Sequence, residues 1–522
     1  MASTNGSTHK GLMIQMPYQH HNIYSSTVLN FNKDIDKHHV DFLVGWDMDK
    51  RHEKYVQAVG KGYASDKLPE LINSSEPMTA ESNYYDDRLL SALSRLNYDF
   101  DNKYYFSANF RMDGSSRLSQ DTRWGSFGSL SLAWRVSQEH FFESISHVIN
   151  EFKLRMSYGV NGTLPKDLYG YLSLFESGYN YQDLPGVAPK NIPNDKLKWE
   201  KNYNFNMGFD LRVFDKVGVV FDFYNRNTKD LLQKVPVSRV VGFRNALRNI
   251  GAMNNRGFEV EINYDVFNRN DIRWTTALAF SHNKNKITKL YGGKDIIDGW
   301  RILREGESYY SWWGREWAGV DPETGEEQWV LNTRDAEGNF NKELTKDPSK
   351  AKRILLGAPD PKLVGGWRNT LSWKGFDLNF LFSFSLGGKV NDNYRITYTD
   401  TDGGKSYYVM SKDALKRWTA PGQKTKVPRR INNYQYSNYG SNRHIYNLNY
   451  MRLKTLTLSY SLPADALSYL GLGNARIYVA GNNLLTLTSY KNIDPESFGY
   501  SGNANWGFPP LKSVNFGIEI TL

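Results

Sequence analysis

The feature that most constrains this chain is a strict alternation of apolar and polar residues over long stretches. In Tyr203–Val213 every second residue is apolar, and asparagine, glycine, aspartate and arginine stand between them. The same period recurs in Val40–Met48, Tyr104–Met112, Phe258–Val266, Phe376–Leu386 and Val514–Leu522. A period of two places successive side chains on opposite faces of a β-strand. The sequence therefore predicts an all-β protein whose strands have one apolar and one polar face.

Strand length and the polar face favour a membrane protein over a soluble sandwich. Many alternating stretches run for about ten residues, as in membrane strands of about 9–11 residues, whereas globular strands have about 5–6. Charged residues such as Glu259 and Glu261 stand mid-strand, where a dry core would not accept them but a water-filled lumen would. Mean hydropathy is −0.60, so hydropathy alone indicates a soluble chain. Because lipid tolerates no open sheet edge, we expect an antiparallel transmembrane β-barrel.

The connections between the expected strands alternate between short and long. The short ones are Asp34–Lys37, Asp101–Asn102, Asp215–Lys216, Asn268–Asp271 and Lys374–Gly375. Two moderate ones, Ser137–His147 and Pro463–Asn474, have room for a helical turn. The long ones are Lys50–Tyr85, Asn161–Lys198, Asn285–Lys362, Asn391–Asn447 and Asn492–Leu511. Outer-membrane barrels have short periplasmic turns and long extracellular loops, so this alternation supports the barrel.

The number of strands and the N-terminus suggest a partial chain. We count about 15 strands, whereas bacterial barrels close with an even number. Asn285–Lys362 has room for one more hairpin, which would leave the count odd. Met1–Gln15 lacks the apolar core of roughly 7–15 residues that a secretory signal needs. We therefore expect the C-terminal part of a larger barrel, that is, a truncated or fragment chain; whether Met1 is the true start stays open.

The residue types that usually carry chemistry are sparse or badly spaced. The chain has no cysteine, which excludes disulfides, thiolate metal sites and cysteine nucleophiles. The adjacent histidines His20/His21 and His38/His39 face opposite sides of a strand, so neither pair is expected to chelate an ion. No catalytic residues, metal site or cofactor are predicted. The net charge of +10 is spread through loops and turns, which favours solvated or lipopolysaccharide-facing loops over nucleic-acid binding.

Two loop segments are candidates for binding. The densest aromatic cluster contains Tyr309, Tyr310, Trp312, Trp313 and Trp317. It is either a platform on which a ligand ring stacks, or part of an interface girdle or of loop packing. The segment Asp321–Glu326 lacks a full calcium-ligand series, and its proline and glycine favour a tight turn.

Seven segments of the sequence resemble a known protein family. The likeness lies in Arg95–Arg117, Arg123–Phe142, Phe152–Gly162, Asn254–Val266, Trp317–Glu326 (WAGVDPETGE), Gly357–Phe384 and Asn492–Leu522. These segments resemble the C-terminal barrel of the SusC/RagA family of TonB-dependent outer-membrane transporters of Bacteroidetes-type bacteria, and they occur in family order.

The resemblance implies an organisation. Residues 1–84 would hold the first visible barrel strands and an outer loop, and residues 85–522 the C-terminal part of a roughly 22-stranded barrel. The plug domain and signal peptide that precede the family's barrel are absent from this sequence. Near the end, Asn515, Gly517, Ile520 and Leu522 keep a spacing that resembles the barrel-assembly signal.

The resemblance also implies a function. Such proteins are not enzymes; they import oligosaccharides or peptides across the outer membrane, with a SusD-like surface lipoprotein as a lid. Energy comes from the TonB complex acting on the plug of an intact parent protein, so the resemblance implies a fragment unable to transport alone. Membrane lipid and a glycan or peptide ligand would be the other partners. The alternative is a secreted aromatic-rich β-protein that binds or hydrolyses glycans, which would need short strands and a dry core.

Overall fold

The computed structural model describes residues 11–521, apart from residues 66, 69, 183, 270, 336, 393–410, 431–439 and 505–507. The chain divides into two compact units. The first contains the chain up to Ala133 together with Ser157–Tyr203 and Thr228–Ile250, and the second contains the remainder. Within the described residues, no helix has both the length and the apolar character needed to cross a membrane.

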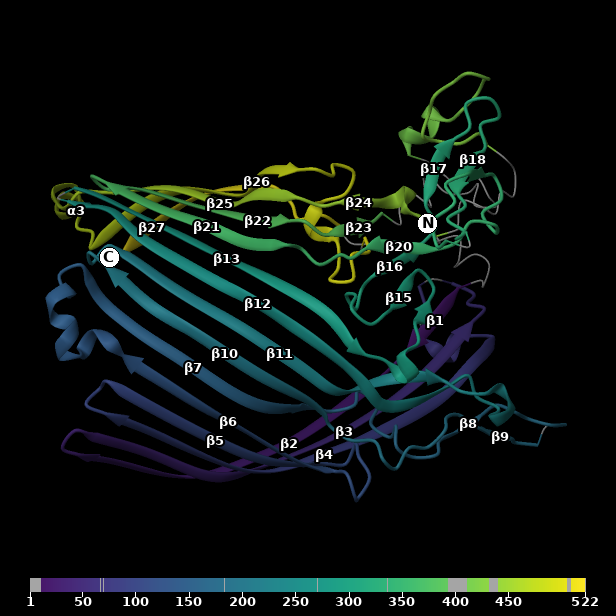
Figure 1. Cartoon of the computed structure of the whole chain (residues 1–522), viewed down its shortest axis with the longest axis horizontal. Helices are drawn as coiled ribbons and strands as arrows, with labels where there is room; N and C mark the ends of the chain where they lie inside the picture. The colour runs from purple at the N-terminus through teal and green to yellow at the C-terminus, as the bar shows by residue number, and fades with distance from the viewer. Residues whose placement is uncertain are drawn as a thin grey trace. The chain divides into compact units, whose positions relative to one another are not determined.

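Most of the structure is one antiparallel sheet of long strands (Figure 1). Its strands are β1 (Leu12–Gln15), β2 (Tyr18–Ile35), β3 (His38–Lys61), β4 (Glu76–Phe100), β5 (Tyr104–Ser115), β6 (Trp124–Arg135), β7 (Ile149–Thr163), β10 (Glu200–Val213), β11 (Val217–Pro236), β12 (Asn245–Arg269), β13 (Ile272–Lys289), β21 (Leu363–Trp373), β22 (Phe376–Leu386), β25 (Tyr450–Ser461), β26 (Asn474–Thr488) and β27 (Ser513–Thr521). Strands of 24 and 25 residues, β3 and β4, do not fit the short-strand alternative.

Shorter elements lie in the connections. The short strands are β8 (Phe175–Ser177), β9 (Val187–Pro189), β14 (Ile296–Asp298), β15 (Arg301–Leu303), β16 (Trp312–Gly314), β17 (Trp317–Val320), β18 (Glu327–Val330), β19 (Leu344–Thr345), β20 (Ile354–Gly357), β23 (Lys389–Asn391) and β24 (Ile445–Asn447). The α-helix is α3 (Ala464–Leu470). Short 3-10 helices are Leu71–Asn73, Val136–Gln138, His140–Ile145, Arg239–Val241, Tyr291–Gly293, Lys412–Lys416, Asn442–His444 and Pro495–Ser497.

The large sheet follows the order of the chain, apart from its first two strands. Both β1 and β2 pair with the same edge of β3, through Leu12 opposite Lys61 and Tyr18 opposite Tyr55. Pro17 stands between them, and proline has no N–H to donate to a ladder. The two segments are thus one interrupted strand, so the 16 strands of the sheet make 15 crossings, close to the number expected from the sequence.

The alternation of short and long connections is confirmed. The tight turn between β4 and β5 places Asp101 and Asn102 at φ 56° and 53°, and the turn between β21 and β22 places Lys374 and Gly375 at 46° and 85°. Positive φ at two successive residues is typical of the hairpin turns that match strand twist. In the moderate connections, two 3-10 helices follow β6 and α3 follows β25. Within the second unit, α3 lies at the end of β25 and β26 opposite to the loops (Figure 1).

The expected bounds of one long loop were wrong. The loop expected at Lys50–Tyr85 spans only residues 62–75, because β3 continues to Lys61 and β4 already begins at Glu76. The residues that extend β3 and β4 beyond the expected ends are charged on both faces of the sheet. They are held by the ladder and by an ion pair of 2.9 Å between Lys61 and Glu76. The division after residue 84 therefore falls inside β4. In Asn285–Lys362, β17 and β18 do form a hairpin, but it belongs to a separate three-stranded sheet with β19.

The two faces of the large sheet differ as the sequence predicted. On β3, the apolar side chains of Phe42, Val44, Trp46 and Met48 are exposed, with Trp46 at 59%, whereas Asp47 is buried to 9% exposure. Exposed apolar side chains continue on other strands: Phe110, Met112, Leu130, Leu132, Met156, Tyr158, Met207, Val514, Phe516, Ile518 and Ile520. An apolar surface of this extent marks contact with lipid or another apolar partner.

We expect Leu130→Arg and Ser131→Arg, on neighbouring positions of β6, to differ sharply. Leu130 is 56% exposed on the apolar face, and a cation facing lipid near the bilayer midplane costs about 2–4 kcal/mol. Ser131 faces the opposite side, where arginine would meet water. Urea unfolding of the protein in liposomes measures the difference; equal stability of the two variants would contradict the assignment of the faces.

Candidate functional site: the polar face and the long loops

Charged side chains on the polar face are tied to one another across strands. Arg111 on β5 contacts Asp113 at 2.7 Å and Asp47 of β3 at 3.2 Å, and it donates to the hydroxyl of Ser91 on β4 at 2.8 Å. The guanidinium therefore joins three strands of the first unit. Because an unpaired charge in a wall of protein is costly, pairing lets the face carry charges without losing stability.

The second unit repeats this arrangement. Arg155 on β7 contacts Asp210 of β10 at 2.9 Å and Asp222 of β11 at 3.0 Å. All three side chains are about one third exposed. The result is a hydrated wall with fixed charges, which suits contact with a polar solute.

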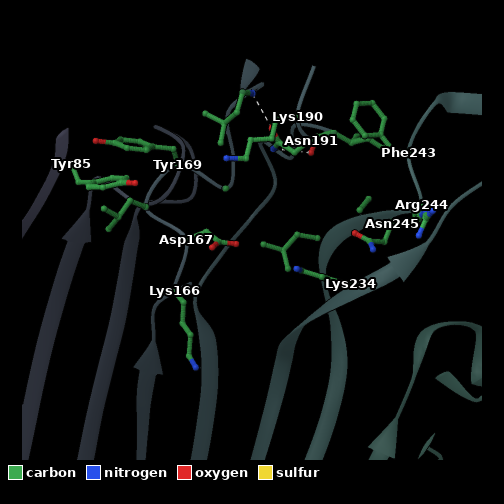
Figure 2. Close-up of a pocket in the computed structure, with 16 residues that line it drawn as sticks. Tyr85, Lys166, Asp167, Tyr169, Lys190, Asn191, Lys234, Phe243, Arg244 and Asn245 are labelled. Carbon is green, nitrogen blue, oxygen red and sulfur yellow. Dashed lines mark hydrogen bonds between the residues drawn. The ribbon is translucent and has the colours of Figure 1, made fainter. Parts of the chain in front are cut away.

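A cavity of about 610 Å³ lies where the long loops of the first unit meet the strand ends (Figure 2). Residues from β4, from the connection between β7 and β10, and from the β11–β12 hairpin line it. Its polar and aromatic lining consists of Tyr85, Lys166, Asp167, Tyr169, Lys190, Asn191, Lys234, Phe243, Arg244 and Asn245. Its volume falls within the range of about 300–1,000 Å³ that is usual for ligand pockets.

A small apolar core fixes the loops beside this cavity. Leu118 and Leu197 are fully buried, and Phe127 and Trp199 pack edge to face with ring centroids 5.2 Å apart. The Trp199 indole N–H donates to the carbonyl of Arg123 at 2.9 Å. Leu164 and Tyr171 of the β7–β10 loop pack against this cluster, together with Leu247 of β12. A loop held by a buried core presents its side chains in a fixed arrangement.

Hydrogen bonds to the backbone hold the cavity walls. The Asn194 amide donates to the carbonyl of Leu247 at 2.9 Å, which joins the β7–β10 loop to β12. The Tyr169 hydroxyl accepts from the backbone N–H of Asp86 on β4 at 2.8 Å. Arg117 donates to the carbonyl of Pro165 at 3.1 Å and forms an ion pair with Asp87 at 2.5 Å. These contacts tie the walls of the cavity to β4 and β12.

The aromatic cluster predicted from the sequence is assembled in the second unit, with arginines covering its indoles. Trp312 is 2% exposed, and the Arg301 guanidinium lies 3.2 Å from its ring centroid. Arg304 lies 4.8 Å from the ring of Trp313.

A third arginine, Arg443, lies 5.0 Å from the ring of Trp317. Burial lowers the pKa of Arg301 to about 10. Tyr309 is 37% exposed and packs on Tyr310. Much of the cluster is thus loop packing by cation–π contacts, and its role in binding ligand stays a prediction.

The turn predicted at Asp321–Glu326 is confirmed. It joins β17 and β18, and Gly325 takes a φ of 68°, where a Cβ would collide with the ring of Trp418. Asp321 receives hydrogen bonds from Lys346, at 2.6 Å, and from the backbone N–H of Glu323. The hydrogen bond from Lys346 is the main cause that lowers the pKa of Asp321 to about 2.

Three residues of the predicted barrel-assembly signal, Asn515, Gly517 and Ile520, lie on β27. The fourth, Leu522, lies outside the described residues. Gly517 stands opposite Tyr478 of β26, and a Cβ at this glycine would meet the tyrosine ring at 2.3 Å. Asn515 stands opposite Ala480, and Ile520 is 58% exposed. The glycine is thus required by packing; the role of these residues in barrel assembly stays a prediction.

The neighbouring histidines make separate contacts. His20 contacts Glu53 at 3.1 Å, whereas His21 stacks on His52. His38 contacts the hydroxyl of Tyr98 at 2.8 Å, while His39 contacts an aspartate on its own hairpin. In the part of the chain that the structure describes, no three histidine or acidic side chains lie together as a metal site would require.

Sequence reasoning missed a buried ion-pair cluster at the loop end of β25. Arg452 is 1% exposed and contacts Asp494, and Glu496 at 2.6 Å; Lys454 contacts the same glutamate at 2.7 Å. Asp494 also caps the 3-10 helix Pro495–Ser497. The cluster fastens the β26–β27 loop to the polar face. Its acidic residues lie in the quoted Asn492–Leu522 segment, but nothing local in the sequence pairs them with Arg452.

Comparison with known proteins assigns the family. A family model described as TonB dependent receptor-like, beta-barrel, matches residues 2–351. The chain belongs to the TonB-dependent receptor β-barrel family. TonB-dependent receptor P3 of Formosa agariphila is 32% identical over 95% of this chain and 50% of its own length. TonB-dependent receptor SusC of Bacteroides thetaiotaomicron is 28% identical over 91% of this chain and 48% of its own length.

Solved structures agree with this assignment. The RagAB peptide transporter superimposes with a TM-score of 0.86 at 28% identity, over 98% of this chain and 56% of that chain. The open-open state of the RagAB peptide importer also gives 0.86, at 27% identity. The protein is thus a SusC/RagA-like β-barrel of an outer-membrane transporter family that is not enzymatic. The chain spans about half the length of the relatives that it matches.

We expect Trp199→Ala to loosen the loops around the cavity while the strands stay folded. The change removes a buried indole and its hydrogen bond, at a cost of about 3–5 kcal/mol. Limited proteolysis should cut residues 164–199 faster in the variant, and Trp373→Ala, at an exposed tryptophan at the turn end of β21, is the control. Unchanged cleavage in Trp199→Ala would show that the core does not hold these loops.

The contacts of Asp321 predict a dependence on pH. Because its pKa in the folded loop lies at about 2, below the ordinary value of 3.8, its contribution to stability is present above pH 3.8. That contribution is lost as the pH falls towards 2. Pepsin cleavage of residues 311–430 should therefore rise between pH 4 and pH 2. In Asp321→Asn, cleavage should already be high at pH 4; a pH profile identical to that of the unchanged protein would refute this account.

Proposed function

We propose that this chain is the barrel portion of a TonB-dependent importer of oligosaccharides or peptides. The observation that carries the proposal is the two-faced sheet with long loops at one end, in a chain that matches the RagAB peptide transporter over 98% of its length. The apolar face contacts outer-membrane lipid. The polar face, with the paired charges of Arg111 and Arg155, lines the path of the solute.

The polar face suits a hydrated solute of considerable size. Its charged side chains pair with side chains on neighbouring strands, so this face stays hydrated and its charges keep fixed positions. Carboxylates, guanidiniums, amides and hydroxyls on this face offer weak and numerous contacts, which a moving oligosaccharide or peptide can exchange. The long loops supply specificity, as loops on a rigid scaffold generally do.

A surface lipoprotein of the SusD class is the proposed partner. The solved RagAB transporter and the SusC relative support this assignment by likeness. The lipoprotein would cover the long loops and close over the bound solute. Energy would come through the TonB complex, acting on a plug domain in the intact transporter.

The test is uptake in cells that carry the natural gene region. Deletion of the sequence for this chain should abolish uptake of an oligosaccharide or peptide too large for porins, and replacement should restore it. The lipoprotein encoded beside it should copurify with the chain in detergent. Uptake that continues without the chain, or a chain that copurifies with no lipoprotein, would contradict the proposal.

A further inference from the structure

The cavity among the long loops of the first unit has a pronounced positive charge. Four cations line it, Lys166, Lys190, Lys234 and Arg244, against a single carboxylate, Asp167. All four cationic side chains are exposed. Figure 2 shows Lys190 and Asp167 on the connection between β7 and β10, and Lys234 near the end of β11. The excess of positive charge in a concave site raises the local concentration of anions.

Two basic residues near the cavity are held in ion pairs with described carboxylates, whereas the cavity cations are not. Lys198 is paired with Asp230 at 3.0 Å, and Arg117 with Asp87 at 2.5 Å. Among the described residues, none of the four cavity cations forms an ion pair with a carboxylate. The four cavity cations are therefore not neutralised by a described carboxylate.

The remaining lining suits a sugar. Phe243 and Tyr85 are aromatic side chains of the kind on which a pyranose ring stacks, and the Asn245 amide can donate and accept hydrogen bonds. Two main-chain N–H groups at the cavity, those of Leu174 and Lys190, are already occupied. The N–H of Leu174 donates to the Asn191 amide at 2.8 Å, and the N–H of Lys190 donates to the Leu174 carbonyl at 2.8 Å. A peptide bound by strand pairing would need such groups free, which favours a saccharide.

We propose that this cavity binds an acidic oligosaccharide, one that carries carboxylate or sulfate groups, as the solute enters the transporter. The inference rests on the proposed importer function and narrows its substrate class. The anionic groups pair with Lys190, Lys234, Lys166 and Arg244, while the sugar rings contact the aromatic side chains. The buried core around Trp199 keeps the loops in place, so little order is lost on binding.

Binding is measured with the purified transporter in detergent by isothermal titration calorimetry. The probes are a galacturonate tetrasaccharide and a sulfated galactose tetrasaccharide, each beside its uncharged counterpart, the methyl ester or the desulfated sugar. We expect at least one charged probe to bind roughly tenfold more tightly than its uncharged counterpart, a difference of about 1.4 kcal/mol. The affinity should fall as salt is raised from 50 to 300 mM, because the attraction is electrostatic.

Two charge-matched double variants locate the site. K190Q/K234Q removes two cavity cations and should weaken the charged probe roughly tenfold, with the uncharged counterpart unaffected. K350Q/K424Q removes two exposed loop lysines outside the cavity and should leave binding unchanged. Circular dichroism and the same heat-modifiable mobility on gels show that each variant is folded.

Several outcomes would overturn the inference. Equal affinity for charged and uncharged sugars, no binding of either tetrasaccharide, or unchanged affinity in K190Q/K234Q would each do so. Tighter binding of a tetraglutamate peptide than of both sugars would assign the cavity to acidic peptides instead. These results are separate from a failure of the importer proposal, which would appear as uptake that does not depend on the chain.

Discussion

The structure depends on the need to satisfy every backbone N–H and C=O by a neighbouring strand. In lipid no water replaces a missing hydrogen bond, so a chain that crosses with strands must form long, unbroken ladders. The pairing of β3 with β4 runs from His38 opposite Phe100 to Lys61 opposite Glu76, with a single irregularity near Gly60. Even where proline interrupts the neighbouring edge, Val56 donates to the Pro17 carbonyl at 3.2 Å.

The ladder fixes where the two kinds of side chain go. Once the backbone is paired, the period of two leaves one face for lipid and one for water, and a shift of one residue would exchange them. Paired charges such as Arg155 with Asp210 then stabilise the polar face in the same register. At the loop end, buried side chains take over this role: Trp199 fixes the first unit's loops, and Arg452 fastens the β26–β27 loop in the second.

The sequence predicted those parts of the fold that depend on local pattern. Alternation located the strands, and turn residues such as Asp101 and Lys374 located the hairpins. The sequence did not predict the outer halves of β3 and β4, which are charged on both faces. Ladder pairing and the ion pair of Lys61 with Glu76 hold these residues in the strands.

Contacts between distant segments were also beyond the sequence. The cavity joins Tyr85 to residues near 166–192 and 234–247, which share no local motif. The density of tryptophans at residues 312–317 was visible in the sequence, but the arginine that covers Trp317 was not, because Arg443 is remote in the chain. Contacts between residues that are far apart in the chain can be identified only from the structure.

The central claim is that one face of the sheet meets lipid and the other meets water. The absence of native cysteine makes a single-cysteine scan along β5 the most direct measurement. In liposomes, a water-soluble maleimide should label cysteine at Ser107 and Asn109, whereas a lipid-soluble quencher should reach a fluorophore at Phe110 and Met112, whose side chains are exposed on the apolar face. Labelling and quenching without this alternation would contradict the account.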